Sequence, residues 1–161
     1  MKILHVVPTY LPAYRYGGPI QSVHALNKYL VRAGAEVTVY TTAIDGSNNL
    51  NVPISSSGDL KPVDLDGVKV FYFKPGLLRS WFYSSHMRRA LKEHAKDFDI
   101  IHVTSVFLAA STLGARAALA AGKPYIISPR GSLMRAPLQK KSSLKKSLYI
   151  YALERDNLRK A

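Results

Sequence analysis

Two adjacent glycines near the start of the chain are the first residues that could do chemistry. Gly17 and Gly18 follow Tyr16 at the end of a turn-rich loop, residues 8–19. Glycines between a strand and a helix let backbone N–H groups approach an anion, and the positive end of the helix dipole adds to the attraction. A bare Gly-Gly pair is also common in plain turns. The strand-loop-helix context is what favours a binding site here.

Two later segments add polar side chains. The run DIIHVTS places His102, Thr104 and Ser105 at the end of an apolar stretch, and SPRGSL places Arg130 and Gly131 after another. A guanidinium beside a glycine can hold a phosphate or a carboxylate through paired hydrogen bonds, although a surface arginine beside a turn is equally compatible with this pattern. A histidine inside a strand is more often a buried structural residue, so His102 is a weak catalytic candidate.

Apolar periodicity predicts the elements that position these residues. Short apolar runs predict strands, and apolar residues at helical spacing predict helices. The expected strands are residues 3–7, 37–40, 68–73, 100–103 and 124–128, and the expected helices lie between residues 19 and 34, at 80–96 and at 109–121. Strands separated by long helices indicate a parallel α/β sheet with helices on both faces. Residues 44–66, rich in Ser, Asn, Asp, Pro and Gly, are expected to form a mobile surface loop.

Three loops of such a sheet are expected to form the binding site. Parallel sheets bind ligands beyond the carboxyl ends of their strands, where residues 9–18, 104–107 and 129–133 would meet. No GxGxxG or GxxxxGK[ST] motif is present, which argues against a dinucleotide-binding fold and a P-loop nucleotidase. The histidines have no ligand spacing, and the Asp-x-Asp pairs at 64–66 and 97–99 lie in a loop and before a strand. We therefore expect no metal.

The composition is that of a basic globular domain. The 161 residues, 47% of them apolar, suffice for one domain with a core. Lys and Arg number 23 against 10 Asp and Glu, and the net charge of +13 predicts an anionic partner. A non-catalytic module for nucleic acid or another anion is thus the alternative to an enzyme, but nucleic-acid motifs are missing. Without cysteine or a long apolar run, we expect a cytoplasmic protein.

The run GGPIQSVHALNKYLVRAGAEVTVYTT resembles the opening of family 4 glycosyltransferases. DIIHVTS and SPRGSL look like two later landmarks of the same amino-terminal domain, in the same order, so that the resemblance spans almost the whole chain. It implies a GT-B architecture, in which two Rossmann-like domains face a cleft. It also implies hexosyl transfer from a nucleotide-sugar to a glycan or lipid-linked acceptor in polysaccharide biosynthesis, usually with retention and without a metal or other cofactor.

The resemblance implies that residues 1–161 are the acceptor-side domain, truncated before a donor-binding domain and inactive alone. Thr104 stands where many members have a histidine that contacts the sugar. A threonine hydroxyl can hydrogen-bond but cannot act as a base near neutral pH, so Thr104 is, like His102, a weak catalytic candidate. The candidate substrate-binding residues are Tyr16, Gly17, Gly18, Thr104, Ser105, Arg130 and Gly131.

The carboxyl-terminal segment is both basic and apolar. Lys140, Lys141, Lys145 and Lys146 precede and enter a helical pattern of apolar residues that continues to Leu153. Lysines near a helix start oppose the helix dipole, which suggests that an external anion balances them. A basic amphipathic helix also suits an acidic membrane surface, here the inner membrane face. A helix that faces the core and has a solvated basic end is the alternative.

Overall fold

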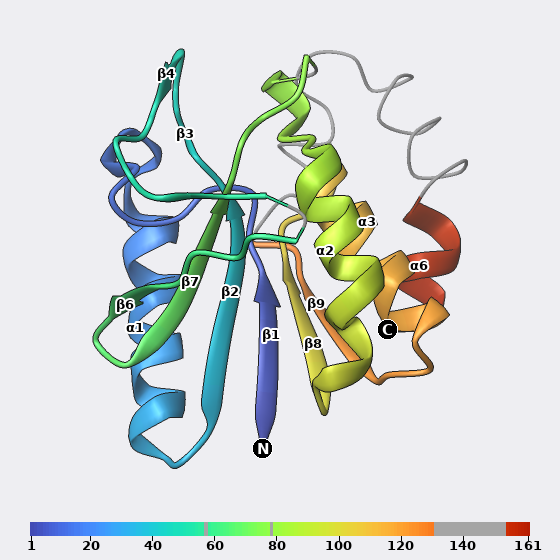
Figure 1. The fold of residues 1–161 in the computed structure, drawn as a ribbon. Coiled ribbons are helices and arrows are strands. Elements are labelled where there is room, and N and C mark those ends of the chain that lie inside the picture. The colour runs from blue at the N-terminus through green and yellow to red at the C-terminus, as the bar shows by residue number, and fades with distance from the viewer. Residues whose placement is uncertain (57, 78, 131–153) are drawn as a thin grey trace.

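The computed structural model describes residues 1–56, 58–77, 79–130 and 154–161. Its main element is a twisted sheet with helices on both faces (Figure 1). The strand order is β5-β7-β2-β1-β8-β9, all neighbours on this path are parallel, and β6 pairs antiparallel with β7. This arrangement confirms the predicted Rossmann-like α/β fold.

The elements follow one another as strand, helix and strand along most of the chain. The strands of the sheet are β1 (Lys2–Val6), β2 (Glu36–Thr42), β5 (Ile54–Ser55), β6 (Val63–Leu65), β7 (Val68–Phe73), β8 (Ile100–Thr104) and β9 (Tyr125–Ser128). Among the described residues, the α-helices are α1 (Gly18–Arg32), α2 (Ser85–His94), α3 (Ala109–Ala120) and α6 (Arg155–Arg159). Short 3-10 helices are η1 (Tyr14–Tyr16), η2 (Arg79–Trp81) and η3 (Ala95–Asp97).

Residues 44–66 are more ordered than their composition predicts. They contain the hairpin of β3 (Ile44–Asp45) and β4 (Asn48–Asn49), and they add β5 and β6 to the edge of the main sheet. Val63 and Leu65 of β6 lie opposite Val70 and Val68 of β7. The expectation that this stretch is only a surface loop is therefore wrong, because it contains short strands. Strands of two or three residues are too short for an alternating pattern to reveal them.

The sheet separates two apolar clusters. Leu4 and Val6 of β1 pack with buried residues of α2 and α3 on one face, and Ile3 packs with Val23 of α1 on the other. This division follows from the alternation of side chains along a strand. The helix predicted from residue 80 begins later, because the Ser84 hydroxyl caps α2 by accepting from the Met87 N–H at 3.3 Å.

Gly114 lets α3 lie close to the sheet. A Cβ there would be 3.1 Å from both the Val6 Cβ and the Val103 Cγ2, which are buried strand atoms. We expect Gly114→Val to lower the free energy of unfolding by about 1–3 kcal/mol, since the core cannot make room without strain. Urea denaturation measures the change. Ala120→Val, at an exposed position of the same helix, is the matched control, and an equal loss in both variants would contradict this account.

Candidate functional site

The carboxyl ends of β1 and β8 border a pocket of about 270 Å³. The first predicted loop contributes Thr9 and Tyr16, the second contributes Thr104 and Ser105, and the third contributes Arg130. Pro19 and Ile20 at the start of α1 and Phe82 before α2 close the sides. The structure thus brings the three loops together, as their positions after parallel strands predict.

The residues on either side of the Gly17–Gly18 pair, Tyr16 and Pro19, line this pocket. Tyr16 lines the pocket, and its hydroxyl accepts a hydrogen bond from the Gly46 N–H at 3.0 Å. Gly17 has a left-handed φ of 68°, which favours glycine, and its N–H already donates to the Tyr14 carbonyl at 3.1 Å. Gly18 is the first residue of α1, where an amide has no intrahelical acceptor. Of the two predicted anion-binding amides, that of Gly18 is therefore the better placed.

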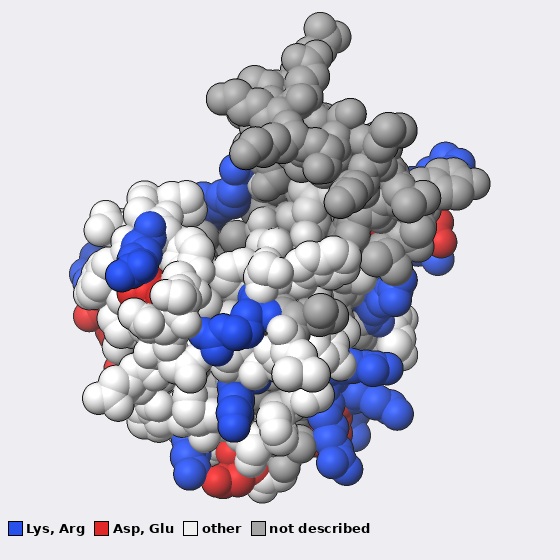
Figure 2. Space-filling model, turned by 90° about the horizontal axis from the view of Figure 1, so that it is seen from above, with Lys and Arg blue, Asp and Glu red and all other residues white. Residues whose placement is uncertain are grey.

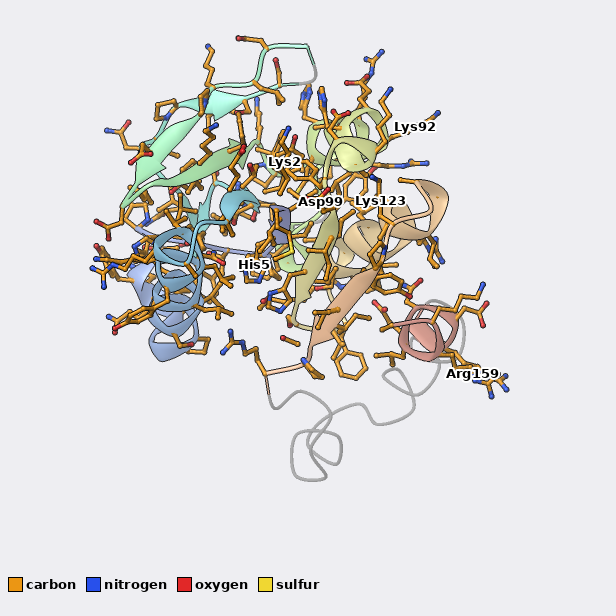
Figure 3. The ribbon with its side chains drawn as sticks, turned by 90° about the horizontal axis from the view of Figure 1, so that it is seen from below. Lys2, His5, Lys92, Asp99, Lys123 and Arg159 are labelled. Atoms are coloured by element: carbon orange, nitrogen blue, oxygen red, sulfur yellow. The ribbon has the colours of Figure 1, made fainter. Side chains whose placement is uncertain are left out.

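Thr104 is held by a histidine that the sequence analysis did not single out. His5 lies beside His102 in the register of β1 and β8, and the two rings stack with centroids 4.0 Å apart. Figure 3 shows His5 in the interior of the molecule, and its side chain is fully buried. His5 Nε2 lies 2.7 Å from the Thr104 hydroxyl, and His5 Nδ1 lies 2.7 Å from the Asn27 amide oxygen.

The donors and acceptors of this network run in one direction. The Asn27 amide nitrogen donates to the Tyr10 hydroxyl at 3.0 Å, so its oxygen accepts from His5 Nδ1–H. This assigns the remaining His5 nitrogen as an acceptor for the Thr104 hydroxyl proton. The lone pairs of the Thr104 oxygen are then free to accept a hydrogen bond from a hydroxyl in the pocket. Two features of the sequence could have indicated this network. His5 is a polar residue in the middle of the first strand, and Asn27 lies in the apolar stripe of α1.

The network continues from the core to the surface. The Tyr10 hydroxyl lies 2.9 Å from His24 Nδ1, and His24 Nε2 lies 3.1 Å from the Asp66 carboxylate. Asp66 also accepts from Lys28 at 3.0 Å, and these hydrogen bonds lower the pKa of its carboxyl. Because each donor meets an acceptor, the buried polar groups are satisfied and the Thr104 side chain is fixed in one orientation.

Burial keeps both stacked histidines uncharged. The pKa of His5 is lowered to about 3. The main cause is the loss of solvation on burial, and the second is the neighbouring His102. The pKa of His102 is lowered to about 4, mainly by the loss of solvation and secondly by the positive charge of Arg130. His102 Nε2 also lies 2.7 Å from the Ser128 hydroxyl. General bases work best with a pKa near the working pH, so this environment favours a positioning role for His102.

Arg130 reaches from the end of β9 toward α1. Its Nη1 lies 3.4 Å from the Ser22 hydroxyl, which places a guanidinium near the first turns of that helix. The backbone of Arg130 has a φ of 50°, and that of Ser105 has a φ of 77°. Non-glycine residues in this region cost about 1–3 kcal/mol each and are frequent at ligand sites. The Ser105 N–H donates to the Ser128 carbonyl at 2.8 Å, which holds the two loops together.

Some of the predicted contacts cannot be placed. Gly131 and the four lysines at positions 140, 141, 145 and 146 lie outside the described residues, so their proposed roles stay predictions. Among the residues that the structure describes, no helix has the length and apolar character needed to cross a membrane.

Comparison with known families gives one match that covers most of the chain. A model described as the glycosyl transferase 4-like domain matches residues 17–161. The match begins at the Gly17–Gly18 pair and contains all three sequence landmarks. A search of curated proteins gives no match. Because the family model covers most of the sequence, the chain belongs to the glycosyl transferase 4-like domain family.

Proposed function

We propose that this chain is the acceptor-side domain of a glycosyltransferase. It would act with a donor-binding domain to move a hexosyl group from a nucleotide-sugar to a glycan or lipid-linked acceptor, with retention and without a metal. The pocket at the carboxyl ends of the strands carries the proposal, because the start of α1 at Pro19, Thr104 and Arg130 all line one space.

These groups suit the charge changes of sugar transfer. Departure of a nucleoside diphosphate builds negative charge on phosphate oxygens, and a helix N-terminus and a guanidinium stabilise such charge where it forms. The Thr104 oxygen, fixed by His5, would accept a hydrogen bond from a sugar hydroxyl and set its orientation. Within the described residues no carboxylate pair lines the pocket, whereas most glycoside hydrolases use a pair of carboxyl groups for catalysis.

The proposed partners and location follow from the proposed sugar transfer and from the basic carboxyl-terminal segment. The nucleotide-sugar is a substrate rather than a cofactor, and we propose a peripheral position at the inner membrane face, with Lys140, Lys141, Lys145 and Lys146 as contacts to an anionic surface. The alternative is a non-catalytic basic module. The net charge of +13 fits that alternative, but it fits any anionic ligand equally well and does not identify one.

Gly18→Val in a protein that includes the donor-binding domain is expected to slow transfer at least about tenfold. The added side chain would block the close approach of an anion to the backbone. A Cβ at Gly18 meets no atom within 4 Å, so the variant is expected to fold. Release of nucleoside diphosphate from a panel of nucleotide-sugars measures the rate, and circular dichroism checks the fold.

The same assay separates the outcomes. A folded Gly18→Val protein that works at the wild-type rate would show that the glycine pair is only a turn. No turnover of any donor by the two-domain wild type, together with retained binding of nucleotide-sugars, would favour the non-catalytic module. Gly18→Ala, with a smaller side chain at the same site, should give an intermediate rate.

A further inference from the structure

A groove of about 760 Å³ lies between α2 and α3, on the face of the sheet opposite α1. It is separate from the pocket described above. Its lining combines four cationic side chains with uncharged, mostly apolar ones. The cations are Arg88, Lys92, Lys96 and Arg116, and the remaining lining residues are Tyr83, Leu113, Ala117, Ala120 and Ala121.

The charges of this groove are concentrated and unbalanced. Arg88 and Lys92 are about one turn apart on α2, and Lys96 follows in the 3-10 helix η3 directly after it. Among the residues that the structure describes, no carboxylate lines the groove and none of its four cations forms an ion pair. The neighbouring Arg89, by contrast, pairs with Glu93 at 3.2 Å. Unpaired like charges repel one another, which points to an external anion.

The figures agree with this placement. Figure 2, seen from above, shows Lys and Arg side chains gathered on the side of the molecule formed by α2 and α3, with few Asp and Glu among them. Figure 3 shows Lys92 projecting from α2 away from the sheet. The four groove cations are exposed, so they can reach a surface laid against the two helices.

The lining of the groove decides which anion fits. Leu113 and the three alanines offer apolar surface beside the cations, so a ligand with an anionic part and an apolar part fits this groove. The stems of Lys and Arg lie well along apolar surface while their charged ends stay in a polar layer. Arg88 on α2 and Arg116 on α3 have the forked donors that pair with phosphate oxygens.

We propose that the α2–α3 groove binds an anionic membrane phospholipid, with its phosphate held by the cations and the start of its acyl chains against the apolar lining residues. This would dock the domain on an anionic membrane. The proposal does not depend on sugar transfer, and it adds a contact distinct from the lysines at 140–146.

A matched pair of charge variants tests the groove. Lys92→Gln/Lys96→Gln removes two groove lysines, and Lys69→Gln/Lys74→Gln removes two exposed lysines outside it. Both variants keep the lysines at 140–146 and lose the same net charge. Co-sedimentation of the full chain is measured with vesicles of phosphatidylglycerol and phosphatidylcholine, and with phosphatidylcholine alone. Circular dichroism confirms that both variants are folded.

We expect the wild type to bind the anionic vesicles and not the neutral ones. Each basic residue at an anionic surface contributes roughly fivefold in affinity, so the groove variant, which loses two, should bind about 25-fold more weakly and the control variant less than about threefold more weakly. Millimolar inorganic phosphate should not displace the protein. Equal weakening in both variants, or equal binding to neutral vesicles, would overturn the proposal. Tighter, groove-dependent binding of polyglutamate would overturn it in favour of an acidic protein partner.

Discussion

Arg130→Gln in the two-domain protein is expected to lower the rate of sugar transfer by about 10²–10³-fold, the usual effect of losing one group that stabilises developing charge. The guanidinium lies at the rim of the pocket near the start of α1, where the leaving diphosphate would gain negative charge. Arg130→Lys keeps the charge but loses the forked donors, so we expect partial recovery. Release of nucleoside diphosphate under saturating donor measures the effect.

Two controls accompany this prediction. Arg32→Gln, at the other end of α1, removes an exposed arginine and should leave the rate unchanged. The charge of Arg130 contributes to the low pKa of His102, so Arg130→Gln should raise that pKa, which NMR titration of the ring can follow. An unchanged rate, with or without a change in that pKa, would mean that Arg130 is a surface residue beside a turn.

The free energy of unfolding is expected to fall as the pH drops below about 6.5. His5 has its ordinary pKa of 6.5 in the unfolded chain and a pKa of about 3 in the folded one. Between these values the unfolded chain binds a proton that the folded chain does not, so acid favours unfolding and the full stability is present above pH 6.5. From pH 6.5 to 4.5, His5 alone is expected to cost about 2–3 kcal/mol.

His102 acts in the same direction, because its folded pKa of about 4 is also below its ordinary value. Urea denaturation at a series of pH values from 7.5 to 4.5 measures the slope. His102→Gln should make the slope shallower, because it removes the contribution of His102 and also one of the causes that lower the pKa of His5. A stability that does not change over this range would show that the stacked histidines take up protons in the folded state and that the burial argument is wrong.

The sequence by itself determined the elements whose signals are local. The apolar run at 68–73 predicts β7 with the bounds that the structure has, and the alanine-rich stretch before Gly122 predicts α3 to within one residue. The alternation of these elements along the chain predicts a parallel sheet, and the parallel sheet predicts that the three loops meet on one edge. Each step follows from hydrophobic periodicity or chain direction, which are readable without contacts.

Only the tertiary structure decided which side chains share a site. His5 meets Asn27 over 22 positions and Thr104 over 99, and no local pattern relates residues that far apart. The strands β5 and β6 exist because β7 offers them hydrogen bonds and apolar partners, since their own residues are too few to specify a strand. The α2–α3 groove likewise joins cations from two helices separated by a strand. Packing brings these groups together, and their burial then sets the pKa values and hydrogen-bond directions that the residue types alone leave open.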